Sequence, residues 1–212
     1  MDFDAKRREM VEEQLKARGI TDTKVLKAMN EVPRHEFVPP ETREIAYGDY
    51  ALPTLSGQAI SQPYIVALMT QELELKPNDS VLEIGAGSGY QAAVLSRIAK
   101  KVYTVERLPE LVEHSANVLR NLCYLNVEVI IGDGTQGFKR KPYDAIMVTA
   151  ACHKVPDALK EQLKEGGRLV IPIGDRYGQV LFKFKKIDGE LIEKRLCECV
   201  FVPLIGPDGW EE

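Results

Sequence analysis

The sequence predicts an α/β fold, built on a doubly wound, mostly parallel sheet with a C-terminal antiparallel hairpin and an N-terminal helical extension. From residue 64 to residue 173, apolar strand-like runs alternate with helical segments. Such alternation is typical of a parallel sheet with helices on both faces. After it, Asp188-Gly189 separates two strand-like runs, 179–187 and 190–202, and Asp-Gly in that position is a strong hairpin signal.

The N-terminal extension should contain two helices followed by an irregular segment. Apolar positions recur at helical spacing over residues 5–18, and a glycine follows them as a stop signal. Asp22 or Thr23 can cap a second helix that runs to Asn30. Prolines and glycines then crowd residues 33–63, which predicts irregular structure, and a loop this long inside a compact domain is often functional.

The core elements follow from the alternation of apolar runs with helical patterns. The expected strands are 80–84, 101–106, 127–131, 144–149 and 168–173, and the expected helices are 64–73, 90–99, 109–122 and 156–163. Runs that are apolar on both faces, such as residues 145–148, suit buried parallel strands. A chain of 212 residues can form one domain with a sizeable core. We therefore expect a single domain over 1–212, with an N-terminal part (1–62), an α/β core (63–178) and a C-terminal hairpin and tail (179–212).

Composition narrows the classes of protein and of site. With 28 basic and 32 acidic residues the formal charge is −4, which gives no general reason to expect nucleic-acid binding. No apolar run reaches the roughly 18 residues that a membrane span needs, and the charged N-terminus does not resemble a signal peptide, so we expect a cytoplasmic protein. The four cysteines and three histidines show no metal-ligand spacing, so no metal site is predicted.

A glycine-rich turn is the first functional motif. Residues 81–90 read VLEIGAGSGY, so a strand runs into Gly85, Gly87 and Gly89 and a helix follows. Glycines allow a tight turn and close approach of a ligand, and the helix offers free N–H groups. Glu106 ends the next strand, 21 residues after Gly85, where its carboxylate can accept the hydroxyl hydrogens of a ribose. The glycine turn and Glu106 together predict a cofactor that contains adenosine. The alternative interpretation is a tight turn that binds no ligand.

Detail around the turn favours S-adenosylmethionine as this cofactor. A dinucleotide-binding fingerprint needs glycine where Tyr90 stands, and no phosphate-binding P-loop motif is present. Glu83 would repel a pyrophosphate but suits the ammonium of a methionine moiety. Asp133, in Gly-Asp-Gly after the strand 127–131, can accept a hydrogen bond from an adenine amino group, or it can be a plain turn aspartate.

Longer motifs carry a more specific resemblance. They are GQAISQPYIVALM at 57–69, VLEIGAGSGY at 81–90, IGDG at 131–134, PYDAIMVTAA at 142–151, LKEGGRLVIPIG at 163–174 and VFVPLIG at 200–206. In these motifs and in their order, most of the chain resembles the protein-L-isoaspartate O-methyltransferases. The resemblance implies a Rossmann-like S-adenosylmethionine-dependent methyltransferase fold.

The resemblance also implies site residues. An isoaspartyl-recognising loop corresponds to residues 53–63, and the active-site serine corresponds to Ser61, whose alternative reading is the N-cap of the helix that starts after it. The cofactor-binding residues expected from the family and from the turn are Gln58, Ala59, Ile60, Ser61, Glu83, Gly85, Ala86, Gly87, Gly89, Glu106, Arg107, Asp133 and Gly134. Those expected for substrate binding are Gly57, Ala59, Ile60 and Ser61. Position 59 is often threonine in the family and is alanine here, so any role of a hydroxyl at that position is lost.

The implied reaction is methyl transfer from S-adenosyl-L-methionine to the free carboxylate of L-isoaspartyl residues in damaged proteins and peptides, with S-adenosyl-L-homocysteine as product. It initiates repair through a succinimide. The carboxylate is ionised at neutral pH, with a pKa of about 4, so it needs no general base. The expected partners are isoaspartyl-containing proteins and peptides, not nucleic acid or membrane, and the expected state is a monomer. The alternatives are another methyltransferase acting on a small molecule or RNA, an NAD-dependent oxidoreductase and a non-catalytic adenosyl-binding module.

Overall fold

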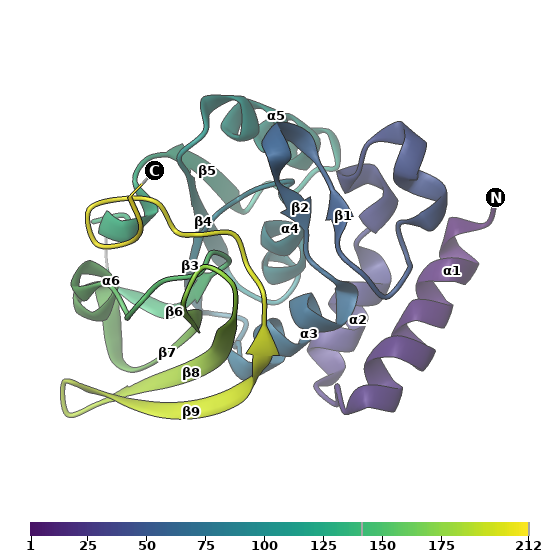
Figure 1. The fold of residues 1–212 in the computed structure, drawn as a ribbon. Coiled ribbons are helices and arrows are strands. Elements are labelled where there is room, and N and C mark those ends of the chain that lie inside the picture. Colours follow the sequence, from purple (N-terminus) through teal and green to yellow (C-terminus); the bar gives the residue numbers. More distant parts are fainter. Residues whose placement is uncertain (141, 212) are drawn as a thin grey trace.

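A seven-stranded sheet forms the centre of the computed structural model, which describes residues 1–140 and 142–211 (Figure 1). Its strands are β3 (Ser80–Ile84), β4 (Lys101–Glu106), β5 (Val127–Ile131), β6 (Tyr143–Val148), β7 (Leu163–Gly174), β8 (Gln179–Ile187) and β9 (Glu190–Cys199). They lie in the order β5-β4-β3-β6-β7-β8-β9. The five strands β3 to β7 are parallel, and β8 is antiparallel to both β7 and β9. The predicted fold, a parallel sheet extended by an antiparallel hairpin, is confirmed.

Six α-helices accompany the sheet in the described part of the chain. They are α1 (Phe3–Glu9), α2 (Thr23–Glu31), α3 (Pro63–Glu72), α4 (Tyr90–Ser96), α5 (Pro109–Asn121) and α6 (Asp157–Gln162). The first continues as a π-helical and then a 3₁₀ turn through Arg18 and stops at Gly19, which is left-handed with φ 90°. Asp22 caps α2, because its carboxylate accepts the Lys24 N–H at 2.8 Å. Both N-terminal helices are thus confirmed.

Three predicted boundaries differ from the structure by three residues or more, and for the first two the reason lies outside the local sequence. Helix α4 ends at Ser96 instead of residue 99, where the side chain of Asn126 donates to the carbonyls of Ser96 and Ala99. Strand β7 begins at Leu163 instead of residue 168, because Leu163 pairs with Tyr143 across an irregularity in the register. Strand β9 ends at Cys199 instead of residue 202.

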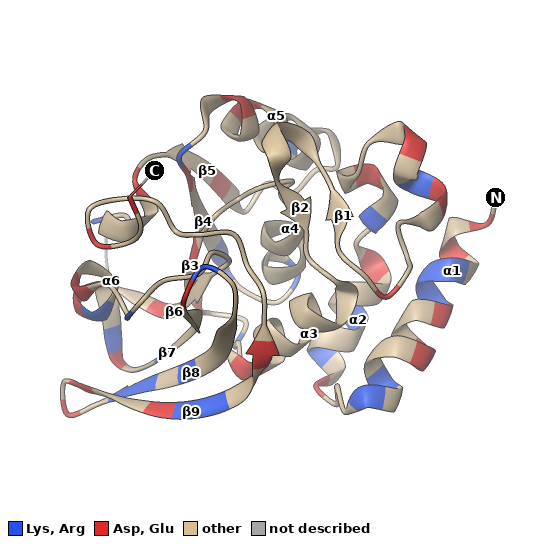
Figure 2. Ribbon diagram, viewed as in Figure 1, with Lys and Arg blue, Asp and Glu red and all other residues tan. Residues whose placement is uncertain are grey.

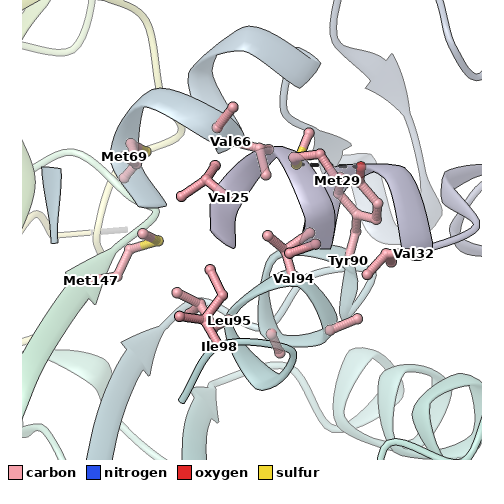
Figure 3. Packing of buried hydrophobic residues seen from close by; sticks show 14 of the residues in the cluster. Val25, Met29, Val32, Val66, Met69, Tyr90, Val94, Leu95, Ile98 and Met147 are labelled. Atoms are coloured by element: carbon pink, nitrogen blue, oxygen red, sulfur yellow. Dashed lines mark hydrogen bonds between the residues drawn. The ribbon is translucent and has the colours of Figure 1, made fainter. Parts of the chain in front are cut away.

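Helices cover both faces of the sheet, but unequally. One buried cluster joins β3, β4 and β6 to α2, α3 and α4 and includes Val25, Met29, Val66, Met69, Val94, Leu95 and Met147 (Figure 3). Alternate strand residues, such as Leu82 and Ile146, face a second cluster that contains Leu159 of α6. The first cluster also takes in Met10, Leu15 and Phe37, so the N-terminal extension shares the core of the sheet.

The segment 33–63 is irregular, as predicted, but it also contains a small hairpin that the sequence did not reveal. Strand β1 (Leu52–Pro53) pairs antiparallel with β2 (Ala59–Ile60). Short 3₁₀ turns at Arg34–Phe37, Pro40–Ile45 and Leu55–Gly57 make up about half of the remainder. This arrangement carries residues 58–61 from the hairpin into the start of α3, beside the sheet.

Charged side chains of both signs are interspersed along α1 and β9 (Figure 2). No helix in the described part of the chain combines the length and the apolar character needed to cross a membrane.

Candidate active site

A cavity of about 410 Å³ lies at the carboxyl ends of β3 and β4. Its wall contains residues from five stretches of chain, 58–61, 84–88, 105–108, 149–150 and 202–205, and also Val66, Met69, Tyr90, Gln91 and Gly134. The carboxyl edge of an open parallel sheet is where such folds bind their ligands. Most of the predicted cofactor residues therefore lie around one cavity.

The glycine turn has a backbone that other residues adopt only under strain. Gly85, Gly87 and Gly89 have φ values of 97°, 50° and 87°. A Cβ atom on Gly85 would collide with Oγ1 of Thr149, which donates to the carbonyls of Ile84 and Gly85 at 2.9 and 2.8 Å. Glycine is thus required at position 85 both by conformation and by space.

Glu106 lies on the cavity wall, held against the glycine turn by hydrogen bonds. Its Oε2 accepts the Gly87 N–H at 3.1 Å, and its Oε1 accepts the N–H groups of Arg107 and Leu108 at 2.8 and 3.1 Å. The side chain is only 8% exposed, so these donors offset the cost of burying it. Each carboxylate oxygen has more than one lone-pair site, so Glu106 can still accept hydrogen bonds from a ligand.

The Asp133 side chain stabilises a turn, which was the alternative interpretation of this residue. Its Oδ1 accepts both the N–H and the hydroxyl of Thr135 at 2.8 Å, which caps the 3₁₀ turn Gly134–Gln136. Gly134 lies on the cavity wall, but the Asp133 side chain does not. The structure thus brings the Gly-Asp-Gly backbone to the cavity, while the carboxylate is partly engaged beside it.

Glu83 is fully buried and lies off the cavity wall, on the side of β3 that faces α3 and α4. Its register partners are Thr104 on β4 and Met147 on β6. Within residues 1–140 and 142–211, neither carboxylate oxygen has a hydrogen-bond partner. Burial raises the pKa of this carboxyl to about 8. A buried acid without a partner is costly, so a cation close by would stabilise its ionised form.

The loop residues Gln58, Ala59, Ile60 and Ser61 all line the cavity, whereas Gly57 does not. Ser61 and Ala59 also line a neighbouring depression of about 450 Å³, together with Tyr50, Ile65 and residues 198–202. The N-cap of α3 is Gln62, without a side-chain capping bond, so the alternative reading of Ser61 as the cap is wrong. Ser61 therefore lies where the two cavities share a wall.

Several wall residues were missed by the sequence analysis. Thr149 and Val202 belong to both cavities, and Pro203, Leu204 and Ile205 complete the first one. The C-terminal segment reaches the site because the N–H and C=O of Ala151 bond to Val202 O and Leu204 N, both at 2.7 Å. Residues 149–150 and 202–205 belong to motifs that carry the family resemblance. These mostly apolar stretches contain no turn or charge signal, so the local sequence did not indicate a role for them.

Comparison with known proteins shows which family has this sequence and architecture. The sequence profile of the family described as Protein-L-isoaspartate(D-aspartate) O-methyltransferase matches residues 5–209. A protein-L-isoaspartate O-methyltransferase of Roseiflexus sp. (strain RS-1) is 53% identical over 211 residues, which is 99% of this chain and 96% of that protein. One from Methanoculleus marisnigri is 52% identical over 206 residues, 97% of this chain and 94% of its own.

Solved structures agree. One protein-L-isoaspartate O-methyltransferase superimposes with a TM-score of 0.85 and 34% identity, covering 96% of this chain and 67% of that one. A Plasmodium falciparum structure assigned to the same enzyme, in complex with S-adenosyl-L-homocysteine, gives a TM-score of 0.83 and 30% identity over 94% of this chain and 98% of its own.

The sheet, the glycine turn and the acid that follows it define the class of Rossmann-like, S-adenosylmethionine-dependent methyltransferases. Within this class, the chain belongs to the protein-L-isoaspartate(D-aspartate) O-methyltransferase family.

Proposed function

We propose that this enzyme methylates the free carboxylate of L-isoaspartyl residues in damaged proteins and peptides, at the wall that its two cavities share. The observation that carries the proposal is the position of Ser61, which lines both the cavity at the glycine turn and the depression beside it. One cavity can hold a methyl donor while the other holds a peptide, with the reacting groups meeting at this wall. Family membership supports the choice of substrate.

The residues around the first cavity fit S-adenosylmethionine. The backbone at Gly85, Ala86 and Gly87 lines the cavity and lets a ligand approach closely, while Gly89 lies off its wall as the N-cap of α4. Glu106 can accept the ribose hydroxyls. The buried Glu83 carboxyl, two residues before Gly85, has a raised pKa of about 8, and a cationic ligand close by would favour its ionised form. When bound, the cofactor supplies an electrophilic sulfonium methyl group. Gln58, Ile60, Arg107 and Gly134 complete its proposed contacts.

The reaction requires the protein to align the two reactants and does not require a general base. The described walls of both cavities contain neither histidine nor lysine, and an ionised carboxylate needs no deprotonation. The Ser61 hydroxyl has no hydrogen-bond partner in the described part of the chain, so it can donate to the substrate carboxylate and orient it. Correct orientation of two reactants can supply roughly 7–11 kcal/mol of the barrier.

The consequence for the substrate is repair. The methyl ester has a better leaving group than the carboxylate, so the neighbouring backbone nitrogen attacks it, releases methanol and closes a succinimide without further help from the enzyme. Hydrolysis of that ring returns some normal aspartyl linkage. The carboxylate of normal aspartate carries the same charge, so only geometry at Ser61 and the adjoining depression can distinguish the two.

A pair of peptides tests this proposal. They have the same sequence, one with isoaspartate and one with aspartate, and radiolabelled methyl transfer gives kcat/KM for each. We expect a ratio of at least about 100, because a misplacement of about 1 Å can cost that factor. Comparable values would contradict the repair function, while methyl transfer itself would leave the methyltransferase class intact.

Cytoplasmic location and a monomeric state also stay predictions. Cell fractionation and sedimentation of the purified enzyme test them separately from the activity.

A further inference from the structure

Tyr90 occupies the position where a dinucleotide-binding turn would need glycine. It is the first residue of α4, follows the left-handed Gly89, and lies on the wall of the cofactor cavity. Its ring is 1% exposed and points from α4 toward α2, where its hydroxyl contacts Met29 Sδ at 3.8 Å (Figure 3). The N-terminal extension therefore packs directly against a residue of the cofactor site.

Arg34 is a residue of this extension whose burial is not explained by a contribution to the stability of the fold. It has no exposed surface, and its Nε donates to the Ala46 carbonyl at 2.7 Å. Both terminal guanidinium nitrogens lack a hydrogen-bond partner among the described residues. The guanidinium carbon lies 4.9 Å from the centroid of the Tyr90 ring. The Phe37 ring meets Tyr90 edge-on, with centroids 5.5 Å apart and planes at 65°.

This arrangement confines the Tyr90 ring between a cation, an aromatic edge and a thioether. A buried cation without an anionic partner normally destabilises a fold, and substitution by an apolar residue of similar volume is often neutral or stabilising. Attraction to the face of an aromatic ring offsets part of that cost, most strongly where water is excluded. The stabilising contact with Arg34 is made by Tyr90, the one aromatic side chain among the described residues of the cavity wall.

We propose that Arg34 is a positioning residue of the cofactor site. Its guanidinium holds the Tyr90 ring in place and thereby fixes the first turn of α4 and the glycine turn that precedes it. The inference rests on the proposed function, since the site it supports is the one assigned to S-adenosylmethionine.

The matched pair Arg34→Met and Arg97→Met tests the inference. The Arg97 guanidinium carbon lies 4.8 Å from the centroid of the Tyr124 ring, almost the same geometry, but neither residue lines the cavity and Arg97 is 43% exposed. Titration calorimetry with S-adenosyl-L-homocysteine should give a Kd raised about five- to tenfold for Arg34→Met, which is part of the roughly thirtyfold that a desolvated cation–π contact is worth. The Kd should be unchanged for Arg97→Met. Thermal melting of Arg34→Met should show an unchanged or higher Tm, and the KM for the cofactor should rise while the KM for an isoaspartyl peptide stays constant.

The outcomes of these experiments distinguish a positioning role of Arg34 from a purely structural role and from failure of the proposed function. A folded Arg34→Met that binds S-adenosyl-L-homocysteine as tightly as the parent enzyme would overturn the positioning role, as would equal weakening in both variants. Arg34→Gln, which keeps a donor for Ala46 but not the charge, should show the same weakening if Arg34→Met does not fold. Failure of both to fold, while Arg97→Met folds, would assign Arg34 to stability alone. A parent enzyme that does not bind S-adenosyl-L-homocysteine would refute the proposed function instead.

Discussion

Ser61 sits on the wall common to both cavities, half-buried and without a capping role in α3. Ser61→Ala should therefore leave the fold unchanged, reduce kcat for isoaspartyl peptides more than about tenfold, and change the Kd for S-adenosyl-L-homocysteine less than about twofold. A single hydrogen bond to a charged group is worth about 1.5–3 kcal/mol, which corresponds to this loss. Initial-rate kinetics and calorimetry measure the two effects, and a kcat equal to that of the parent would remove Ser61 from the reaction.

Glu83 makes stability depend on pH. Its pKa is about 8 in the folded protein, against about 4.3 in an unfolded chain. Between these values the folded state holds a proton that the unfolded state has released, so the free energy of unfolding falls as pH rises. Glu83→Gln removes this loss and should stabilise the protein more at pH 9 than at pH 5, by an amount on the order of a few kcal/mol.

Chemical unfolding at the two pH values measures the effect of Glu83→Gln. The exposed Glu193 provides the control, because Glu193→Gln should change stability equally little at both. A stabilisation by Glu83→Gln that is the same at pH 5 and pH 9 would show that the carboxyl is ionised throughout this range.

At the scale of elements, the turn between β3 and α4 depends on space as well as on backbone conformation. Gly85 and Gly87 both have positive φ, but a Cβ on Gly87 meets nothing within 4 Å, whereas one on Gly85 collides with Thr149. Both alanine substitutions carry the backbone strain of about 1–2 kcal/mol. We therefore expect Gly85→Ala to abolish measurable binding of S-adenosyl-L-homocysteine and Gly87→Ala to weaken it only moderately.

Circular dichroism confirms folding of both turn variants, and calorimetry then compares their affinities. Equal losses would show that strain alone limits the turn. In that case the contact between Gly85 and Thr149 has no separate effect on the cofactor site.

At the scale of the whole molecule, Arg168 joins distant parts of the chain. Its guanidinium donates to the carbonyls of Leu73 and Asp144 at 2.7 and 2.8 Å and pairs with Asp79 at 2.5 Å. Breaking a buried ion pair by removing one partner typically costs about 3–5 kcal/mol. Arg168→Met should lower the free energy of unfolding by this amount. Lys194→Met, which removes a largely exposed partner of Glu72, should cost no more than about 1 kcal/mol.

Thermal unfolding of both ion-pair variants also tests the division of the chain. Because the N-terminal extension shares the core cluster of the sheet, we predict one domain over residues 1–212 and one cooperative transition. Two separate transitions would assign the extension to a unit of its own.

The elements were predictable because their signals are local. Strands β3, β4 and β5 have the predicted bounds, and the hairpin turn has positive φ at Asp188 (52°) and Gly189 (79°), the conformation that Asp-Gly favours. In contrast, two-residue strands such as β1 and β2 carry no periodicity. The start of β7 depends on its partner strand, which lies elsewhere in the sequence.

The sequence by itself determined the parallel sheet, its hairpin, the glycine turn and the family, since turn residues, apolar spacing and motifs act over short stretches of chain. Only the tertiary structure decided that Ser61 joins two cavities and that residues 202–205 close one of them. It also decided that Glu83 is fully buried between its neighbouring strands and is not part of the cavity wall. A strand that is apolar on both faces does not specify which way a given residue points, and the bonds between Ala151 and residues 202–204 span about fifty residues of sequence. These contacts form only when the whole chain packs.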